Sequence, residues 1–239
     1  MPPRLQGPLP QDLLTKLAAY DTPTICNALE IVAPERRLKG FTHRSLFCLH
    51  PNAPPTVGYA RTATIRGTAA SDLPEQEQRE KRFAYYAYVA SGHGPRISLI
   101  QDLDGPNAGF GAFWGEVHSA VHKALGCIGV VTDGSIRDLP QFAEGFQALA
   151  GMVAPSHAHN HLCDFAQHVR VAGMDVSSDD LIHADQHGAV VIPRNVAAKV
   201  PEAAELCMRR EAPILAACRS KDFSLEALRA AIMKSGEIH

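Results

Sequence analysis

Hydrophobic and polar positions along the chain follow two alternating patterns, and residues 115–138 contain both. From Val117 to Leu125, apolar and small side chains recur every three or four positions, which predicts an amphipathic helix. Gly126 follows directly, and glycine commonly ends a helix. The apolar run 128–131 then predicts a buried strand of a parallel sheet, and Asp133-Gly134 predicts a turn at the end of that strand.

The remainder of the chain repeats this alternation. Helices are predicted over residues 12–19, 22–29, 74–90 and 225–233, with a further helical region from Arg194 onward that is interrupted near Pro201 and Pro213. Short strands are predicted over residues 59–65, 97–100, 152–154, 169–172 and 189–192, and residues 32–57 are mostly loop. Helices that alternate with short apolar strands indicate an α/β layered fold.

Composition is that of an ordinary globular enzyme. The chain has 239 residues, of which 46% are hydrophobic and 20% charged, so we expect a single domain over residues 1–239. Residues 1–10 are rich in proline and predict a loose N-terminal arm, and residues from about 194 to 239 predict a C-terminal helical extension. A net charge of −2 gives no support for binding nucleic acid, and no apolar run has the length of a membrane span.

The cysteines indicate a reducing compartment. They are scattered along the chain without CxxC spacing, which argues against a disulfide framework or a zinc knuckle. We therefore expect free thiols and a cytoplasmic protein. The six are Cys26, Cys48, Cys127, Cys163, Cys207 and Cys218.

Residues 115–138 also carry the candidate chemistry. A helix that begins near Gly115 presents unpaired N–H groups that suit a carboxylate. Arg137 offers a planar fork of donors for a carboxylate or an enolate oxygen, and Asp138 offers the hard anionic oxygen that Mg²⁺ or Mn²⁺ prefers. Two plainer interpretations stay open. Asp138 precedes Leu139-Pro140 and could cap a helix, and Arg137 could form a weak surface ion pair.

These residues resemble a known family. The pattern Gly-Glu/Asp-x-x, about twenty residues, then Gly-x-x-Gly-x-Val-x-Asp-Gly-x-x-Arg-Asp is complete from Gly115 to Asp138. Segments 58–64, 180–185 and 187–193 also match, so the resemblance covers about residues 12–200. The chain is similar to the RraA-like family, which includes the divalent-metal class II 4-hydroxy-4-methyl-2-oxoglutarate aldolases and oxaloacetate decarboxylases.

The resemblance implies a layered α/β/β/α sandwich of the swivelling-domain type, with sites at subunit interfaces of a homotrimer or homohexamer. It implies that the backbone amides of Gly115, Glu116, Val117 and His118 bind the substrate, and that Glu116 orients a water or proton relay. By the same resemblance Arg137 binds the 2-oxo acid and Asp138 holds Mg²⁺ or Mn²⁺. The implied activity is a carbon–carbon lyase that cleaves a 2-oxo acid through a pyruvate enolate.

Two other functions remain open from the sequence. His157, His159 and His161 would place three imidazoles on one face of a strand, which would suit the zinc ion of a hydrolase. The second alternative is a non-catalytic regulator or scaffold, since one branch of the family consists of ribonuclease E regulators that lack the metal-binding Asp. Asp138 is present here, which favours the catalytic branch.

Overall fold

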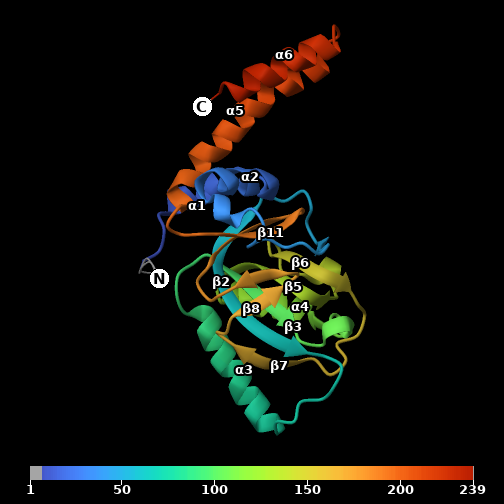
Figure 1. Ribbon diagram of the computed structural model, residues 1–239. Coiled ribbons are helices and arrows are strands. Elements are labelled where there is room, and N and C mark those ends of the chain that lie inside the picture. The colour runs from blue at the N-terminus through green and yellow to red at the C-terminus, as the bar shows by residue number, and fades with distance from the viewer. Residues whose placement is uncertain (1–6, 239) are drawn as a thin grey trace.

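The computed structural model of the protein describes residues 7–238 (Figure 1). The α-helices in that range are α1 (Gln11–Leu17), α2 (Thr22–Val32), α3 (Glu75–Ala90), α4 (Glu116–Ala124), α5 (Val200–Arg219) and α6 (Leu225–Gly236). The strands are β1 (Phe47–Cys48), β2 (Thr56–Arg66), β3 (Arg96–Asp102), β4 (Ala112–Trp114), β5 (Cys127–Ile136), β6 (Gln147–Val153), β7 (His161–Phe165), β8 (Val169–Val171), β9 (Met174–Val176), β10 (Leu181–Asp185) and β11 (Gly188–Ile192).

Most strands form one curled sheet. Its order is β1-β6-β5-β3-β2-β10-β11, with β4 paired to β5 and β7 paired to β2, while β8 and β9 form a separate antiparallel hairpin. The central strands β2, β3, β5 and β6 are parallel, and β10 and β11 are antiparallel. β2, β3 and β5 are buried along almost their whole length, and β6 over its first four residues, as expected for a parallel sheet covered on both sides.

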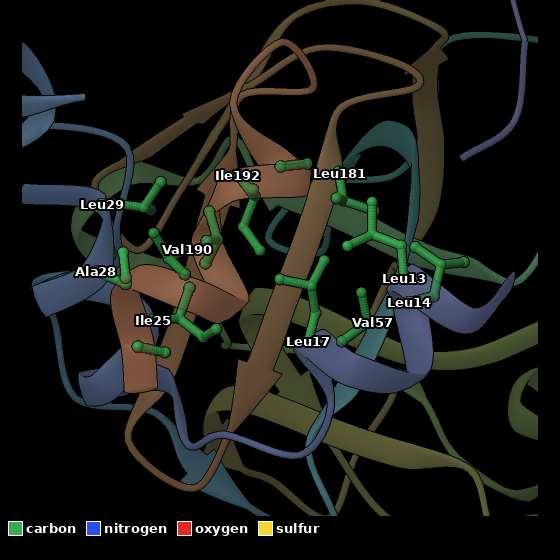
Figure 2. Packing of buried hydrophobic residues seen from close by; sticks show 14 of the residues in the cluster. Leu13, Leu14, Leu17, Ile25, Ala28, Leu29, Val57, Leu181, Val190 and Ile192 are labelled. Atoms are coloured by element: carbon green, nitrogen blue, oxygen red, sulfur yellow. The ribbon is translucent and has the colours of Figure 1, made fainter. Parts of the chain in front are cut away.

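Three apolar clusters separate the layers of the fold. The first joins α1, α2 and the start of α5 to β2, β10 and β11 (Figure 2). The second lies inside the curl, where the β8–β9 hairpin packs between the central strands and β10–β11. In the third, α3 packs on the opposite face of β2, β3, β5 and β6. The order is therefore helix, sheet, sheet, helix, and the predicted α/β/β/α class is confirmed.

The predicted turn at Asp133-Gly134 is wrong, because β5 continues through it to Ile136. The pairing of β5 with β6 shifts register between Thr132 and Ser135, so Asp133 and Gly134 together face one residue of β6 and form a bulge within the strand. The side chain of Asp133 accepts a hydrogen bond from the backbone N–H of Asp102 on β3 at 2.7 Å, which fixes the bulge to the neighbouring strand. The site residues thus leave the end of one long strand.

The C-terminal helices differ from prediction in their continuity. α5 runs without a break from Val200 to Arg219, with Pro201 in its first turn and Pro213 inside it. Pro201 lies in the first turn, where a backbone N–H would have no partner within the helix, and Pro213 removes only one helical hydrogen bond. α6 packs along α5. The pair extends away from the sheet (Figure 1). Within residues 7–238, no helix combines the length and apolar character of a membrane span.

Of the predicted N-terminal arm, residues 1–6 lie outside the described part of the chain. The backbone N–H of Leu9 donates to the Tyr59 hydroxyl at 2.7 Å, and Arg194 donates to the carbonyl of Gly7. The segment directly before α1 is thus attached to β2 and to the residues before α5.

Candidate functional site

The candidate site lies where β4, β5 and the start of α4 meet. β4 ends at Trp114, Gly115 is the N-terminal cap residue of α4, and Arg137 directly follows β5. The backbone N–H of Arg137 donates to the carbonyl of Trp114 at 2.9 Å, which joins the two segments. Residues more than twenty positions apart in sequence are therefore neighbours, as the motif spacing requires.

Gly115 is needed for space. Its φ of −166° is ordinary extended backbone, but a Cβ at this position would lie 2.5 Å from Oδ2 of Asp138 and 3.2 Å from Cγ of Arg137. The absent side chain lets the Asp138 carboxylate approach the first turn of α4. Oδ2 lies 3.4 Å from the backbone nitrogen of Glu116, so the carboxylate accepts a long hydrogen bond from the helix N-terminus.

Asp138 precedes the 3-10 helix Leu139–Gln141, but its side chain makes no capping hydrogen bond to that helix. Its backbone lies in the left-handed region, at φ 56° and ψ 41°. The carboxylate instead turns toward α4 and toward Nε of Arg137, 3.6 Å away. Because the Arg137 and Asp138 side chains are 38% and 39% exposed, this ion pair contributes little to stability.

A cavity of about 350 Å³ opens beside Arg137. Arg137, Val117 and His118 line it, whereas Gly115, Glu116 and Asp138 are not among its lining residues. The structure therefore groups the sequence-predicted residues into two adjoining parts, and the Arg137 side chain belongs to both. The other lining residues are Arg82, Tyr85, Tyr86, Ala112, Phe113, His157, Asn160 and Leu162.

His118 lines this cavity and is partly buried, and the fully buried His122 lies next to it on α4. The His118 ring lies 4.4 Å from the Phe113 ring, and burial, with smaller effects from Arg82 and Arg137, lowers the pKa of His118 to about 4. His122 has Nε2 2.9 Å from the Tyr85 hydroxyl and Nδ1 2.8 Å from the carbonyl of His118. Burial lowers the pKa of His122 to about 3. Both rings are therefore neutral at neutral pH.

Several residues of the cavity were not predicted from the sequence. Arg82 reaches it from α3, Phe113 from β4, and Asn160 from the loop before β7. Both polar atoms of the Asn160 side chain are buried and have no hydrogen-bond partner within residues 7–238. Only Phe113 had a sequence signal, its position two residues before Gly115, because the other two come from segments remote in sequence.

The three-histidine zinc face does not form. β7 begins only at His161, so His157 and His159 lie in the preceding loop and the alternation of a strand does not apply. Nδ1 of His157 lies 2.7 Å from the carbonyl of Ala158, and Nδ1 of His161 lies 3.0 Å from that of His159. In the described part of the chain, no three His, Cys, Asp or Glu side chains are grouped to hold a metal ion.

Solved structures with a similar fold are distant in sequence. An uncharacterized protein from Pseudomonas syringae pv. tomato str. DC3000 is 21% identical with a TM-score of 0.72, covering 97% of this chain and 98% of that chain. The Streptomyces coelicolor protein RraAS2, described as an unusual member of the RNase ES inhibitor RraA family, is 22% identical with a TM-score of 0.66, covering 86% and 96%. A structure described among novel cellulases from microbes associated with the gut ecosystem is 17% identical with a TM-score of 0.69, covering 87% and 89%.

At these identities the three structures support the fold alone. No curated protein matches the chain. The sequence model of the RraA-like family, described as Aldolase/RraA, matches residues 22–191, which include the whole curled sheet apart from the last residue of β11. The matched range also contains the complete Gly115 to Asp138 pattern. The chain therefore belongs to the RraA-like (Aldolase/RraA) family.

Proposed function

We propose that the protein is a divalent-metal-dependent lyase that cleaves a carbon–carbon bond of a 2-oxo acid, by retro-aldol reaction or by decarboxylation of oxaloacetate. The observation that carries this proposal is the position of Arg137. Its side chain lies 3.6 Å from the Asp138 carboxylate and also lines the cavity, beside the N-terminus of α4. An anionic oxygen bound there would meet a cation, a hydrogen-bonding helix end and a candidate metal ligand together.

The donors present fit a weakly held Mg²⁺ or Mn²⁺. Asp138 is exposed, and its one contacted oxygen makes only the two long interactions described above, so the carboxylate can accept a hard cation. Mg²⁺ often uses one or two protein carboxylates and takes its other ligands from water and substrate. Asp138 would hold the ion, which would polarise the 2-oxo group and help to stabilise developing negative charge on its oxygen.

Backbone and side-chain groups of the protein would supply the rest of the chemistry. Backbone N–H groups of residues 115–118, at the start of α4, would hold the substrate carboxylate. When the C3–C4 bond breaks, negative charge develops on the 2-oxo oxygen, where Arg137 would stabilise the enolate. Glu116, in the exposed first turn of α4, would orient the water that takes the hydroxyl proton in the aldol reaction. Both reactions give a pyruvate enolate, so one site serves for both.

We also propose a homotrimer or homohexamer in the cytoplasm. One copy leaves Val117 70% exposed beside the half-exposed Arg137 and Asp138, as expected for a site completed by a neighbouring subunit. All six cysteines are free, which suits a reducing compartment. Sedimentation equilibrium would measure the oligomer, and a purely monomeric protein at micromolar concentration would contradict this part of the proposal.

The test is a pyruvate-release assay over a panel of 4-hydroxy-2-oxo acids and oxaloacetate. We expect activity with Mg²⁺ or Mn²⁺, loss of activity in EDTA, and recovery when the metal is restored. Activity that persists unchanged in EDTA would refute the metal dependence. A folded oligomer that is inert toward the whole panel would instead favour a non-catalytic regulator. RraAS2, which has a similar fold, is described as a member of an RNase ES inhibitor family.

A further inference from the structure

The cavity beside Arg137 extends well beyond the groups needed to hold a 2-oxo acid. The reacting end of the substrate would lie between Asp138, the start of α4 and Arg137. The rest of the 350 Å³ is available to whatever is attached at C4. Its volume falls in the range of pockets that bind whole organic ligands, and it exceeds what a carboxylate or a methyl group at C4 would fill.

The wall of this outer part includes several aromatic and apolar side chains, beside the polar Arg82, His157 and Asn160. Tyr85 and Tyr86 reach it from α3, Phe113 from β4, Val117 from α4, and Leu162 from β7. The aromatic members already contact one another or the neighbouring imidazoles. The ring centroids of Tyr85 and Tyr86 lie 5.8 Å apart, and those of His118 and Phe113 lie 4.4 Å apart. A planar ring would find both faces and edges there, which favour aromatic pairing.

The charged side chains of the cavity are two arginines. Apart from Arg137, the only Lys or Arg among the lining residues is Arg82, an exposed residue of α3. The lowered pKa of His118 keeps its ring neutral, so it adds no positive charge to the wall. No Asp or Glu is among the lining residues. The case for an uncharged aryl group therefore rests on the aromatic wall, and a carboxylate bound by Arg82 is the alternative that the experiments must exclude.

We propose that the cavity binds an aromatic group on C4 of the substrate, so that the substrate class is 4-aryl-4-hydroxy-2-oxo acids. This rests on the proposed lyase function. The C3–C4 bond breaks, its electron pair goes to C3 as the enolate, and the hydroxyl proton passes to the water beside Glu116. The C4 carbon leaves as an aryl aldehyde, and protonation of the enolate at C3 gives pyruvate. Atoms and charge balance without any oxidant or reductant.

The first experiment compares kcat/KM for three 4-hydroxy-2-oxo acids that differ only at C4, which carries a phenyl, a methyl or a carboxylate group. We expect the phenyl compound to exceed both others by tenfold or more. Activity on oxaloacetate combined with equal or better use of the methyl or carboxylate compound would overturn the aryl proposal and leave the lyase function intact. No pyruvate from any substrate, oxaloacetate included, would overturn both.

Variants then test the wall itself. Phe113→Leu, and independently Tyr86→Leu in case the first does not fold, should lower the phenyl-to-methyl ratio of kcat/KM by about three- to tenfold, the size of an aromatic pair. The matched control is Phe83→Leu, because Phe83 lies on α3 beside Arg82, is 70% exposed, and does not line the cavity. An unchanged ratio in both wall variants would refute the proposal.

Arg82→Gln separates the aromatic substituent from an anionic one. We expect the phenyl-to-methyl ratio to stay within about twofold of wild type; a loss of the preferred activity specific to Arg82→Gln would favour a carboxylate and overturn the proposal. A readout independent of turnover is also available. The single tryptophan, Trp114, has its ring 6.2 Å from Phe113 and 6.1 Å from His118, so its fluorescence should change when the phenyl compound binds. The methyl compound at equal concentration should change it less.

Discussion

The substitution Asp138→Asn tests whether this carboxylate binds a metal ion or serves only the local backbone. Asn is nearly isosteric and keeps an oxygen that can accept a hydrogen bond from the N–H of Glu116, 3.4 Å away. Asn also tolerates the left-handed backbone of this position, at φ 56°. What it removes is the negative charge, and an amide oxygen is a poor replacement for an anionic Mg²⁺ ligand.

The expected change in stability follows from the contacts that are lost. The side chain makes no capping bond, so no cap is removed. The pairing with Arg137 spans 3.6 Å between groups that are more than a third exposed, where an ion pair is worth at most about 1 kcal/mol. We therefore expect the free energy of unfolding to change by less than about 1 kcal/mol, while activity falls by about two orders of magnitude or more.

Urea denaturation and pyruvate release, each after removal of trace metal and re-addition of Mg²⁺, measure the two effects. Asp175→Asn is the matched control, because Asp175 is an exposed aspartate of β9 that lies 3.9 Å from Arg170 and does not line the cavity. It should leave both quantities nearly unchanged. Full activity in Asp138→Asn would refute the metal-ligand assignment. A decrease of several kcal/mol in the free energy of unfolding would refute the conclusion that the Asp138 side chain contributes little to stability.

Three further predictions concern the arginine, the histidine loop and the buried imidazoles. Arg137→Ala should reduce kcat/KM by about 3–4 kcal/mol in transition-state free energy and weaken oxalate binding, with only partial recovery in Arg137→Lys; unchanged oxalate affinity would exclude Arg137 as the enolate partner. His159→Ala should leave lyase activity largely intact and the purified protein without stoichiometric zinc, measured by metal analysis; one zinc per chain that is lost in the variant would restore the hydrolase alternative. Because burial lowers the pKa of His118 to about 4 and of His122 to about 3 from 6.5, the unfolded chain binds protons that the folded one does not as pH falls below 6.5. Stability should therefore decline between pH 6.5 and 4, less steeply in His122→Gln, and an equal slope in both proteins would contradict the assignment.

The helices and the central strands could be predicted because their signals are local. The span of α3 was predicted to within one residue, since Pro74 precedes a long charged and aromatic segment of helical spacing. β3 and β11 were found from short β-branched runs. In each case the residues that decide the structure lie within the element itself, so neighbours in sequence were sufficient.

The missed strands depend on distant partners. β10 has an ordinary composition, yet it pairs with β2 and β11 and is fully buried. β9 is three residues long and exists through its pairing with β8. The false turn in β5 has the same origin, because the hydrogen bond from the N–H of Asp102 to Asp133 comes from another strand. Local turn propensity had no access to that contact.

For the candidate site, the sequence pattern identified the residues but not their division into two parts. Adjacent positions such as Arg137 and Asp138 were expected to act together, and the structure does place them in contact. Arg137 alone extends into the cavity, whereas Asp138 faces the start of α4. The far wall of the cavity comes from α3 and from the loop before β7, whose approach depends on the curl of the sheet and not on any motif.

The left-handed backbone of Asp138 sets the stability of the folded protein against its proposed function. A non-glycine residue at φ 56° is held at a local energetic disadvantage, of order 1 kcal/mol, that glycine would not have. Asp138→Gly should therefore melt no earlier than the wild type, although it removes the proposed ligand. A selection for heat resistance alone would favour that replacement. Stability alone therefore does not account for an aspartate at this position.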